Sequence, residues 1–332
     1  MASKYDDKEE DEDEEGREED EEGEGQKLVD PESFESGPKT IFVGEWSTVK
    51  GINDAIELAN EKDSIYVNGG KYDEEVKLHK PSISISGPPD MSAEILNGLT
   101  ATSNFCTLSK LCINAGLSIR CGNLLVSECD IKKAQNGIQV YRTARPTITR
   151  CTIHEVAKCH IAVFPGGNAV VEKNEITGDG QRGSVGLYAD DAVDVTFKEN
   201  LVSNCMTGVY TINGCKGVQI YENKINDSTG HGVYADQQSQ PNVKNNEIKN
   251  AVHYGLVVAG GSTGVYRDNI IHSSVRIHTA CRPSMFGNIV VKPGVVMADD
   301  TRYAMRGVVF KRPEELPKPK KPPPPEEEEE EA

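Results

Sequence analysis

The sequence predicts an all-β solenoid, a parallel β-helix in which short strands stack coil upon coil. Two observations lead to this prediction: a repeat of about 23 residues, and an alternation of side chains within each repeat. A fixed period in the twenties indicates a solenoid with one coil per repeat. The first mark of the repeat is a Gly before an aliphatic residue, at Gly137-Ile138, Gly186-Leu187, Gly208-Val209, Gly232-Val233 and Gly255-Leu256, with His160-Ile161 in the remaining place.

A second mark of the repeat is an Asn or Cys two residues before an aliphatic residue. It occurs at Cys129-Ile131, Cys151-Ile153, Asn174-Ile176, Asn200-Val202, Asn223-Ile225, Asn246-Ile248 and, in weaker form, Asp268-Ile270. Asn tolerates the left-handed backbone of tight turns, and its amide satisfies backbone groups there. We therefore predict a structural ladder of stacked Asn side chains formed by Asn174, Asn200, Asn223 and Asn246.

The strands are predicted from alternation inside each coil. In the segment 208–212, Val209 and Thr211 should face one way, and Tyr210 and Ile212 the other. No helical period separates these strands, which favours a β-helix. A leucine-rich repeat would need a Leu framework that is missing, and a propeller would need a period near twice this one.

The N-terminal part of the solenoid is predicted to begin with a capping helix. Apolar residues between Val49 and Ala59 follow helical spacing, and Ser47 and Thr48 precede them as possible N-caps. Such a helix would cover the first coil. We expect roughly eight to ten coils, ending near Val296.

Charge divides the chain into three parts. Residues 1–35 hold 18 Asp/Glu against 4 Lys/Arg, and residues 312–332 hold 8 against 4. Subtracting both from the totals of 53 and 36 leaves 27 acids and 28 bases for residues 36–311. We predict disordered tails at 1–35 and 312–332, the second starting with an extended Pro/Lys stretch, around a β-helix domain at 36–311.

Composition also limits partners and location. A neutral domain between acidic tails argues against nucleic acid, and the tails suit a basic protein partner. No signal peptide and no apolar run of membrane length is visible, so we predict no membrane association. The nine cysteines form no Cys-x-x-Cys pair and are interpreted as reduced thiols, with Cys112, Cys129 and Cys151 at repeat positions. We expect a protein of the cytoplasm, nucleus or cytoskeleton, with no cofactor and no metal.

The segment from Thr48 through Asp63–Tyr72 to Gly87 resembles the start of pectin-lyase-like right-handed β-helix proteins. The coils at 146–153, 166–176 and 241–248 resemble the β-helix of the F-box-only and Shc-SH2-binding families. This resemblance implies a right-handed β-helix over about residues 40–295. Residues 1–35 are too short and acidic for an F-box, and no zinc finger follows the coils, so ubiquitin-ligase function is not implied.

Several acidic and basic residues are candidates for catalysis. The fragments Asp190-Asp191, Gly230-His231-Gly232 and Arg276-Ile277-His278 are similar to a polygalacturonase set, in which paired carboxylates act beside a His and a basic residue. Asp191 and His231 are nearly two coils apart where that pattern expects about one, and the third fragment ends in His instead of Lys. A calcium-dependent lyase site would use Asp190, Asp191 and Asp194 with Arg182. We predict no catalytic residue, with Asp190, Asp236 and His231 as the weak candidates.

A binding face is predicted from the outward residues of the repeat. Tyr188, Tyr210 and Tyr234 should form one column on three successive coils. A parallel column holds Tyr141, Phe164, Asp190, Ile212, Asp236 and Ala259. Rows of exposed aromatic rings bind sugars or peptides, but tyrosines also pair across strands only to stabilise a sheet.

From these observations we predict a non-catalytic intracellular protein-recognition scaffold. The first alternative is a polysaccharide-active enzyme, a glycosidase or lyase, that uses the Tyr/Asp face on a glycan. The second is a structural subunit of a cytoskeletal or cell-division assembly.

Overall fold

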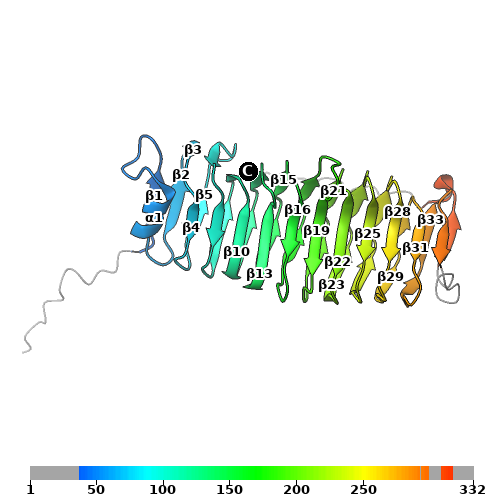
Figure 1. Ribbon diagram of the computed structural model, residues 1–332. Coiled ribbons are helices and arrows are strands. Elements are labelled where there is room, and N and C mark those ends of the chain that lie inside the picture. Colours follow the sequence, from blue (N-terminus) through cyan, green and yellow to red (C-terminus); the bar gives the residue numbers. More distant parts are fainter. Residues whose placement is uncertain (1–36, 292, 299–307, 317–332) are drawn as a thin grey trace, which may run out of the picture. The chain divides into compact units, whose positions relative to one another are not determined.

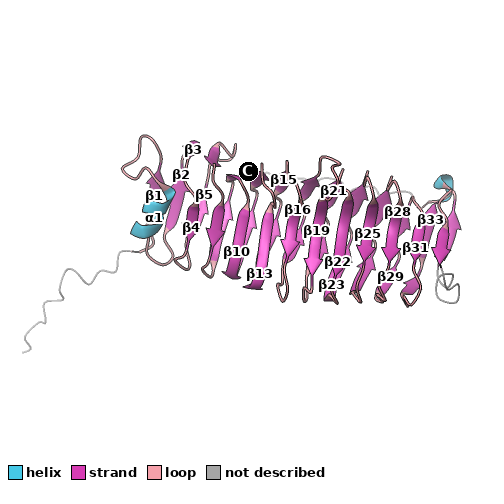
Figure 2. Cartoon of the chain, in the orientation of Figure 1, coloured by secondary structure: helices cyan, strands magenta, loops and turns pink. Residues whose placement is uncertain are grey.

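The computed structural model describes residues 37–291, 293–298 and 308–316, which form a right-handed parallel β-helix (Figure 1). Figure 2 shows that the coils consist almost entirely of strands and loops. The prediction of an all-β solenoid is confirmed. The predicted N-terminal tail at 1–35 lies outside the described residues. Of the predicted C-terminal tail at 312–332, only 312–316 is described, and it contains the 3₁₀ helix η2 (Pro313–Glu315).

Three sheets run along the stack of coils, and successive strands within each sheet are parallel. Sheet A contains β1 (Thr40–Val43), β2 (Ser64–Val67), β5 (Ser84–Ser86), β8 (Cys106–Ser109), β11 (Leu124–Ser127), β14 (Thr147–Thr149), β17 (Val170–Glu172), β20 (Thr196–Lys198), β23 (Lys216–Tyr221), β26 (Gln240–Lys244), β29 (Val265–Arg267) and β32 (Ser284–Phe286). Sheet B contains β3 (Gly70–Tyr72), β6 (Ala93–Ile95), β9 (Cys112–Asn114), β12 (Asp130–Lys132), β15 (Thr152–His154), β18 (Glu175–Thr177), β21 (Leu201–Ser203), β24 (Lys224–Asn226), β27 (Glu247–Lys249), β30 (Ile270–Ile271), β33 (Asn288–Val291) and β35 (Val308–Lys311). Sheet C contains β4 (Val76–Leu78), β7 (Leu99–Ala101), β10 (Leu117–Gly122), β13 (Ile138–Ala144), β16 (Cys159–Val163), β19 (Val185–Asp190), β22 (Thr207–Ile212), β25 (His231–Ala235), β28 (Tyr254–Val258), β31 (Val275–Ile277) and β34 (Val296–Ala298).

The solenoid has more coils than the repeat predicted. Sheets A and B each hold 12 strands and sheet C holds 11 in the described part of the chain. The additional coils come from the N-terminal segment, where strands such as β2 and β5 stack in register although the Gly and Asn marks are missing. Their inward residues, including Ile65 and Ile85, are fully buried. Alternation of apolar and polar residues is therefore enough to form a coil, and the Gly and Asn marks occur only in coils further along the chain.

The predicted capping helix is present as α1 (Ile52–Leu58), but its start was placed wrongly. The N-cap is Gly51 instead of Ser47 or Thr48, and Gly51 has no side chain that could cap the helix. The carboxylate of Glu74 instead accepts hydrogen bonds from the backbone N–H groups of Ile52 and Asn53, at 2.6 and 3.1 Å. A residue of the next coil thus satisfies the free helix donors. No helix among the described residues is long and apolar enough to cross a membrane.

The predicted Asn ladder is present and is longer than expected. Each Asn accepts, through Oδ1, from the backbone N–H of the Asn one coil earlier, as in Asn200 to Asn223 at 2.9 Å. The Nδ2 of Asn223 donates to Oδ1 of Asn246 in the next coil and to the backbone oxygen of Phe197, on the sheet A strand one coil earlier. The ladder consists of Asn174, Asn200, Asn223, Asn246, Asn269 and Asn288, all at most 2% exposed. The weak match at Asp268 was therefore one residue out of register.

The turn geometry around the ladder also differs from the expectation. The left-handed residue is the one before each Asn, for example Lys173, Glu199 and Glu222 with φ of 56°, 53° and 59°. The Asn side chains are thus not needed for an unusual backbone angle. They are needed because they link the buried backbone of one coil to the next.

The repeat glycines allow the coils to approach closely. A Cβ on Gly232 would lie 2.4 Å from Cγ2 of Ile248 and 2.5 Å from the backbone oxygen of Gly255. No side chain fits at such distances. The exception is the coil of His160, whose ring is fully buried with Nδ1 3.0 Å from the Val185 oxygen and Nε2 3.1 Å from the Thr177 oxygen.

All nine cysteines lie in the described part of the chain, where they are free thiols, and seven of them are buried. Cys151 takes the ladder position next to Asn174, whose Oδ1 accepts from the Cys151 backbone N–H at 2.9 Å. Cys112 does not hold a ladder position. It pairs in register with Asp130 in sheet B, so Leu111 occupies the place that aligns with Cys129.

Candidate binding face on sheet C

Three tyrosines form a column on the outside of sheet C, which we call the tyrosine column. Tyr188, Tyr210 and Tyr234 are Cα partners in the adjacent strands β19, β22 and β25. Their neighbours Leu187, Val209 and Val233 are fully buried, so strand alternation turns the tyrosines outward. The three tyrosine side chains are half-buried. The register predicted from the sequence is the register of the structure.

The rings of the tyrosine column contact one another. The centroids of Tyr210 and Tyr234 are 4.9 Å apart with the planes at 21°, and Tyr188 meets Tyr210 edge to face at 5.8 Å. His231 continues this surface, 5.3 Å from Tyr234 and stacked on Tyr254 at 5.8 Å. The result is a continuous aromatic strip over four coils. Part of its geometry serves the sheet, because such pairs contribute about 0.5–1.5 kcal/mol each.

Two carboxylates border the tyrosine column. The Tyr188 hydroxyl donates to Asp190 at 3.2 Å, and the Tyr210 hydroxyl donates to Asp236 at 3.4 Å. Asn213 donates to the second oxygen of Asp190 at 2.7 Å. Burial, with the nearby carboxylate as a smaller cause, raises the pKa of Tyr188 and of Tyr210 to about 12. Both phenols therefore stay protonated at neutral pH and can serve as donors.

The carboxylates lie two coils apart. Asp190 is in register with Ile212, and the backbone N–H of Asp236 donates to Thr211 in the same coil as Ile212. Two coil steps correspond to about 10 Å along the stack. This is far from the ~5–5.5 Å of a retaining glycosidase pair and just above the ~6.5–9.5 Å of an inverting pair.

His231, the third weak catalytic candidate, is not brought to these carboxylates. It begins strand β25 while Asp236 follows the end of that strand, and five residues of extended chain separate the two by about 16 Å. Register places His231 between Thr207 and Tyr254, the same position in neighbouring coils. Burial and the nearby His253 lower the pKa of His231. His231 therefore does not join Asp190 and Asp236 in one site.

Tyr141 and Phe164 form a second aromatic group on earlier coils. Their centroids are 5.0 Å apart, and the Arg120 guanidinium lies 4.4 Å from the Tyr141 centroid. Arg120 was missed by the sequence reasoning, as were His231 and Tyr254 as parts of the aromatic strip. Aligning Arg120 with Tyr141 one coil away would have found the first of these. His231 and Tyr254 would have been found by aligning the residues that directly precede the repeat glycines of successive coils.

The possible calcium cluster and the position of the main hollow remain to be described. No group of three or more His, Cys, Asp or Glu side chains that could hold a metal ion occurs within residues 37–291, 293–298 and 308–316. Asp191 and Asp194, proposed with Asp190 as a calcium cluster, lie in turns with φ of 43° and 56°. A hollow of about 760 Å³ is present, but it lies on sheet B beside η2 and not on the tyrosine column.

The fold and its ladder define a right-handed parallel β-helix protein. The chain belongs to the family described as the right handed beta helix region, whose model matches residues 96–228 and 207–294. A search of curated protein sequences finds no significant relative.

Solved structures with a similar fold are known, all at low identity. The Dettilon tailspike protein has 13% identity and a TM-score of 0.52, over 77% of this chain and 63% of that chain. The periplasmic alginate epimerase AlgG has 12% identity and a TM-score of 0.52, over 75% and 70%. The complex of XylC with xylose has 11% identity and a TM-score of 0.56, over 75% of each chain. The chain thus spans less than two thirds of the tailspike, and the likeness concerns the fold.

These comparisons correct the predicted function. The prediction of a non-catalytic intracellular protein-recognition scaffold is wrong, because the similar structures include an alginate epimerase and a xylose complex. The narrower resemblance to the F-box-only and Shc-SH2-binding β-helices has no support among them. The location in the cytoplasm, nucleus or cytoskeleton stays a prediction.

Proposed function

We propose that this protein is a polysaccharide-active β-helix that binds a glycan chain along sheet C. The observation that leads to this proposal is the tyrosine column, three outward rings in register on consecutive coils. The coil spacing of ~4.8 Å is comparable to the advance of one extended sugar residue, so successive rings can pack against successive sugars. The fold of the similar structures supports this proposal over a protein-binding role.

The chemistry of the column suits a sugar. Each sugar has an apolar face that packs on an aromatic ring, and hydroxyl groups around its edge that need partners. Asp190, Asp236 and Asn213 lie next to the rings and offer carboxylate oxygens and an amide. The phenol hydroxyls already bonded to the aspartates hold these acceptors in place, which reduces the ordering cost of binding.

The test is the affinity of the full chain for a panel of neutral and uronic-acid polysaccharides, measured by affinity electrophoresis and calorimetry. Replacing Tyr188, Tyr210 and Tyr234 by Ala should weaken binding by about 100-fold, taking about 1 kcal/mol per ring. Tyr221→Ala is the matched control, because Tyr221 is a half-buried tyrosine on sheet A that packs against Lys244. Binding that is unchanged in the triple variant, with both variants folded by circular dichroism, would refute the proposal.

Cleavage is a second candidate function, favoured only by the two carboxylates. Their separation of about 10 Å slightly exceeds the inverting range, so binding is the better-supported function. Release of reducing ends from a polysaccharide bound by the wild type, lost in both Asp190→Asn and Asp236→Asn, would establish hydrolysis. Retained binding without release would establish a binding module.

A further inference from the structure

Two arginines lie side by side on the outer face of sheet C because of a β-bulge. The register between β10 and β13 shifts at this point, so that Tyr141 and Arg142 of β13 both lie opposite Arg120 of β10. Strict alternation would have turned Arg142 toward the core. Instead Arg142 and Thr143 are both exposed, so the bulge brings a second arginine to the outer face, next to Tyr141.

Both arginine side chains are oriented by their neighbours. The Arg120 guanidinium lies over the Tyr141 ring, with Cζ 4.4 Å from the centroid. A cation over a ring face needs no hydrogen bond, so its N–H groups remain available for a partner. The stem of Arg142 runs beside Gly166 of the next coil, where a Cβ would lie 3.0 Å from Cγ of Arg142. Gly166 has a φ of 72°, which favours glycine, and its missing side chain leaves room for the arginine.

No carboxylate neutralises these two arginines. Among the described residues, no ion pair joins Arg120 or Arg142 to an acid. The sheet C strands from β7 to β16, and the turn that directly follows each of them, contain no Asp or Glu. The acidic pair 190–191 lies two coils beyond β13, and Glu155 lies before β16, at the opposite end of that strand. Exposed Arg145, just after β13, adds a third positive charge, so this part of the surface is positive.

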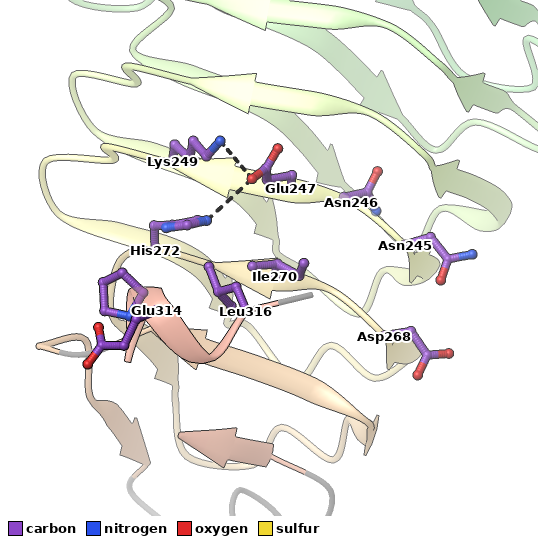
Figure 3. A pocket seen from close by; sticks show the side chains of 10 residues that line it. Asn245, Asn246, Glu247, Lys249, Asp268, Ile270, His272, Glu314 and Leu316 are labelled. Atoms are coloured by element: carbon purple, nitrogen blue, oxygen red, sulfur yellow. Dashed lines mark ion pairs between the residues drawn. The ribbon is translucent and has the colours of Figure 1, made fainter. Parts of the chain in front are cut away.

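The basic groups of the hollow on sheet B differ from these arginines because they are paired. Lys249 Nζ lies 2.7 Å from Glu247 Oε1, and His272 Nε2 faces the same oxygen at 3.4 Å (Figure 3). An anion bound there would have to displace Glu247, whereas Arg120 and Arg142 have no such partner among the described residues. The arginine pair on sheet C is therefore the better anion site.

The arginine pair lies at one end of a row of aromatic rings that is longer than the tyrosine column. Tyr141 in β13 and Phe164 directly after β16 precede the tyrosine column, so that five consecutive coils present an aromatic ring. Phe164 aligns with Asp190, two residues from Tyr188 along the strand. Asp190 and Asp236 border the later part of the row. The row is thus positive at its beginning and negative further along.

We propose that Arg120 and Arg142 form a subsite for an acidic group of the bound polysaccharide, a uronate carboxylate or a sulfate ester. This inference rests on the proposed function and adds the class of substrate. Guanidinium groups bind such oxyanions through paired N–H donors, while Tyr141 packs against the sugar that carries the anion. Acidic sugars two and four coils beyond β13 would face Asp190 and Asp236 and be repelled. The polysaccharide therefore carries acidic groups on some of its sugars and only hydroxyls on others.

The test compares polymers that differ in charge, measured with the full chain by calorimetry at about 0.15 M salt. Glucuronoxylan, a neutral xylan with scattered uronate groups, is paired with its carboxyl-reduced form, and lightly sulfated dextran is paired with dextran. In at least one pair the acidic polymer should bind about tenfold more tightly than its neutral counterpart. The pair that shows this preference distinguishes carboxylate from sulfate. Polygalacturonate, with a carboxylate on every sugar, should bind less tightly than the preferred polymer.

Two double variants with the same change in net charge complete the test. Arg120→Gln/Arg142→Gln should remove the tenfold preference and leave binding of the neutral polymer unchanged. The control Arg150→Gln/Arg267→Gln alters exposed arginines at sheet A and should keep the preference. Circular dichroism establishes that both variants are folded.

The outcomes separate this inference from the proposed function. Equal binding of acidic and neutral polymers, or a preference that survives in Arg120→Gln/Arg142→Gln, would overturn the inference. Tighter binding of polygalacturonate than of both mixed polymers would also overturn it. The proposed function fails separately, when replacement of Tyr188, Tyr210 and Tyr234 by Ala leaves binding unchanged. Absence of binding to every polymer would refute both.

Discussion

The buried Asn ladder allows a quantitative prediction, for the variant Asn223→Ala. Asn223 is 1% exposed and makes four side-chain hydrogen bonds. Its Oδ1 accepts from the backbone N–H and from Nδ2 of Asn200 at 2.9 and 3.1 Å. Its Nδ2 donates to the Phe197 oxygen at 2.8 Å and to Asn246 Oδ1 at 2.9 Å.

The expected cost follows from the groups that lose their partners. Truncation removes the acceptor of the Asn200 backbone N–H and of one N–H of Asn200 Nδ2, whose other N–H still donates to the Val171 oxygen. The Phe197 oxygen loses its side-chain donor. Each unsatisfied buried group costs about 1–3 kcal/mol, so the free energy of unfolding should fall by about 3–5 kcal/mol. Asn246 Oδ1 loses less, since it still accepts from the Asn223 backbone N–H at 3.0 Å.

The assay is urea unfolding followed by circular dichroism, compared with the control Asn242→Ala. Asn242 is half-buried on the outside of sheet A and donates only to the Gln219 side chain at 2.9 Å, so its loss should cost less than about 1 kcal/mol. Asn223→Cys should fall between the two, because Cys151 fills a ladder position naturally. Equal costs for Asn223→Ala and Asn242→Ala would refute the view that the ladder links the coils.

Three other perturbations have expected outcomes. Glu74→Ala removes the acceptor of two free N–H groups of α1 and should lower stability by about 0.5–2 kcal/mol, measured by thermal unfolding. Gly232→Ala places a Cβ 2.5 Å from a backbone oxygen of the next coil and should cost about 1–3 kcal/mol or more in urea, and a neutral result would contradict the close packing of coils. Burial lowers the pKa of His160 more than its two carbonyl neighbours raise it, so the unfolded chain takes up this proton first as pH falls. Stability should therefore drop below about pH 6.5, and His160→Gln should reduce that drop between pH 7 and pH 5.

The fold could be predicted mainly from the periodicity of the sequence. The Gly and Asn marks gave the coil length and the ladder, and the alternation in 208–212 gave the outward direction of Tyr210. These features depend on residues close in sequence or one period apart. The tyrosine register followed from the same arithmetic, which is why it matched the structure.

Other features depend on contacts between coils that carry no repeat mark. Glu74 caps α1 from about one coil away, and no local signal distinguishes it from other surface carboxylates. The coils of β2 and β5 lack both marks and are held by buried aliphatics alone. The pairing of Tyr210 with Asp236 joins two coils and depends on side-chain rotamers. Function was predicted wrongly because the fold itself does not specify a ligand.

The constant spacing of the ladder means that whole coils could be added to or removed from this protein. Asn200 to Asn223 and Asn223 to Asn246 are both 23 residues apart, and each Asn side chain bonds to the Asn of an adjacent coil and to a backbone oxygen one coil earlier. Removal of residues 223–245 would place Asn246 where Asn223 was. Asn246 could then accept from Asn200 and donate to the Phe197 oxygen, as Asn223 does. The joint between coils would be restored while Tyr234 and its strand were lost. A β-helix of this kind can therefore shorten or lengthen sheet C by one strand at a time, through duplication or loss of one period, while the hydrogen bonds between coils stay the same.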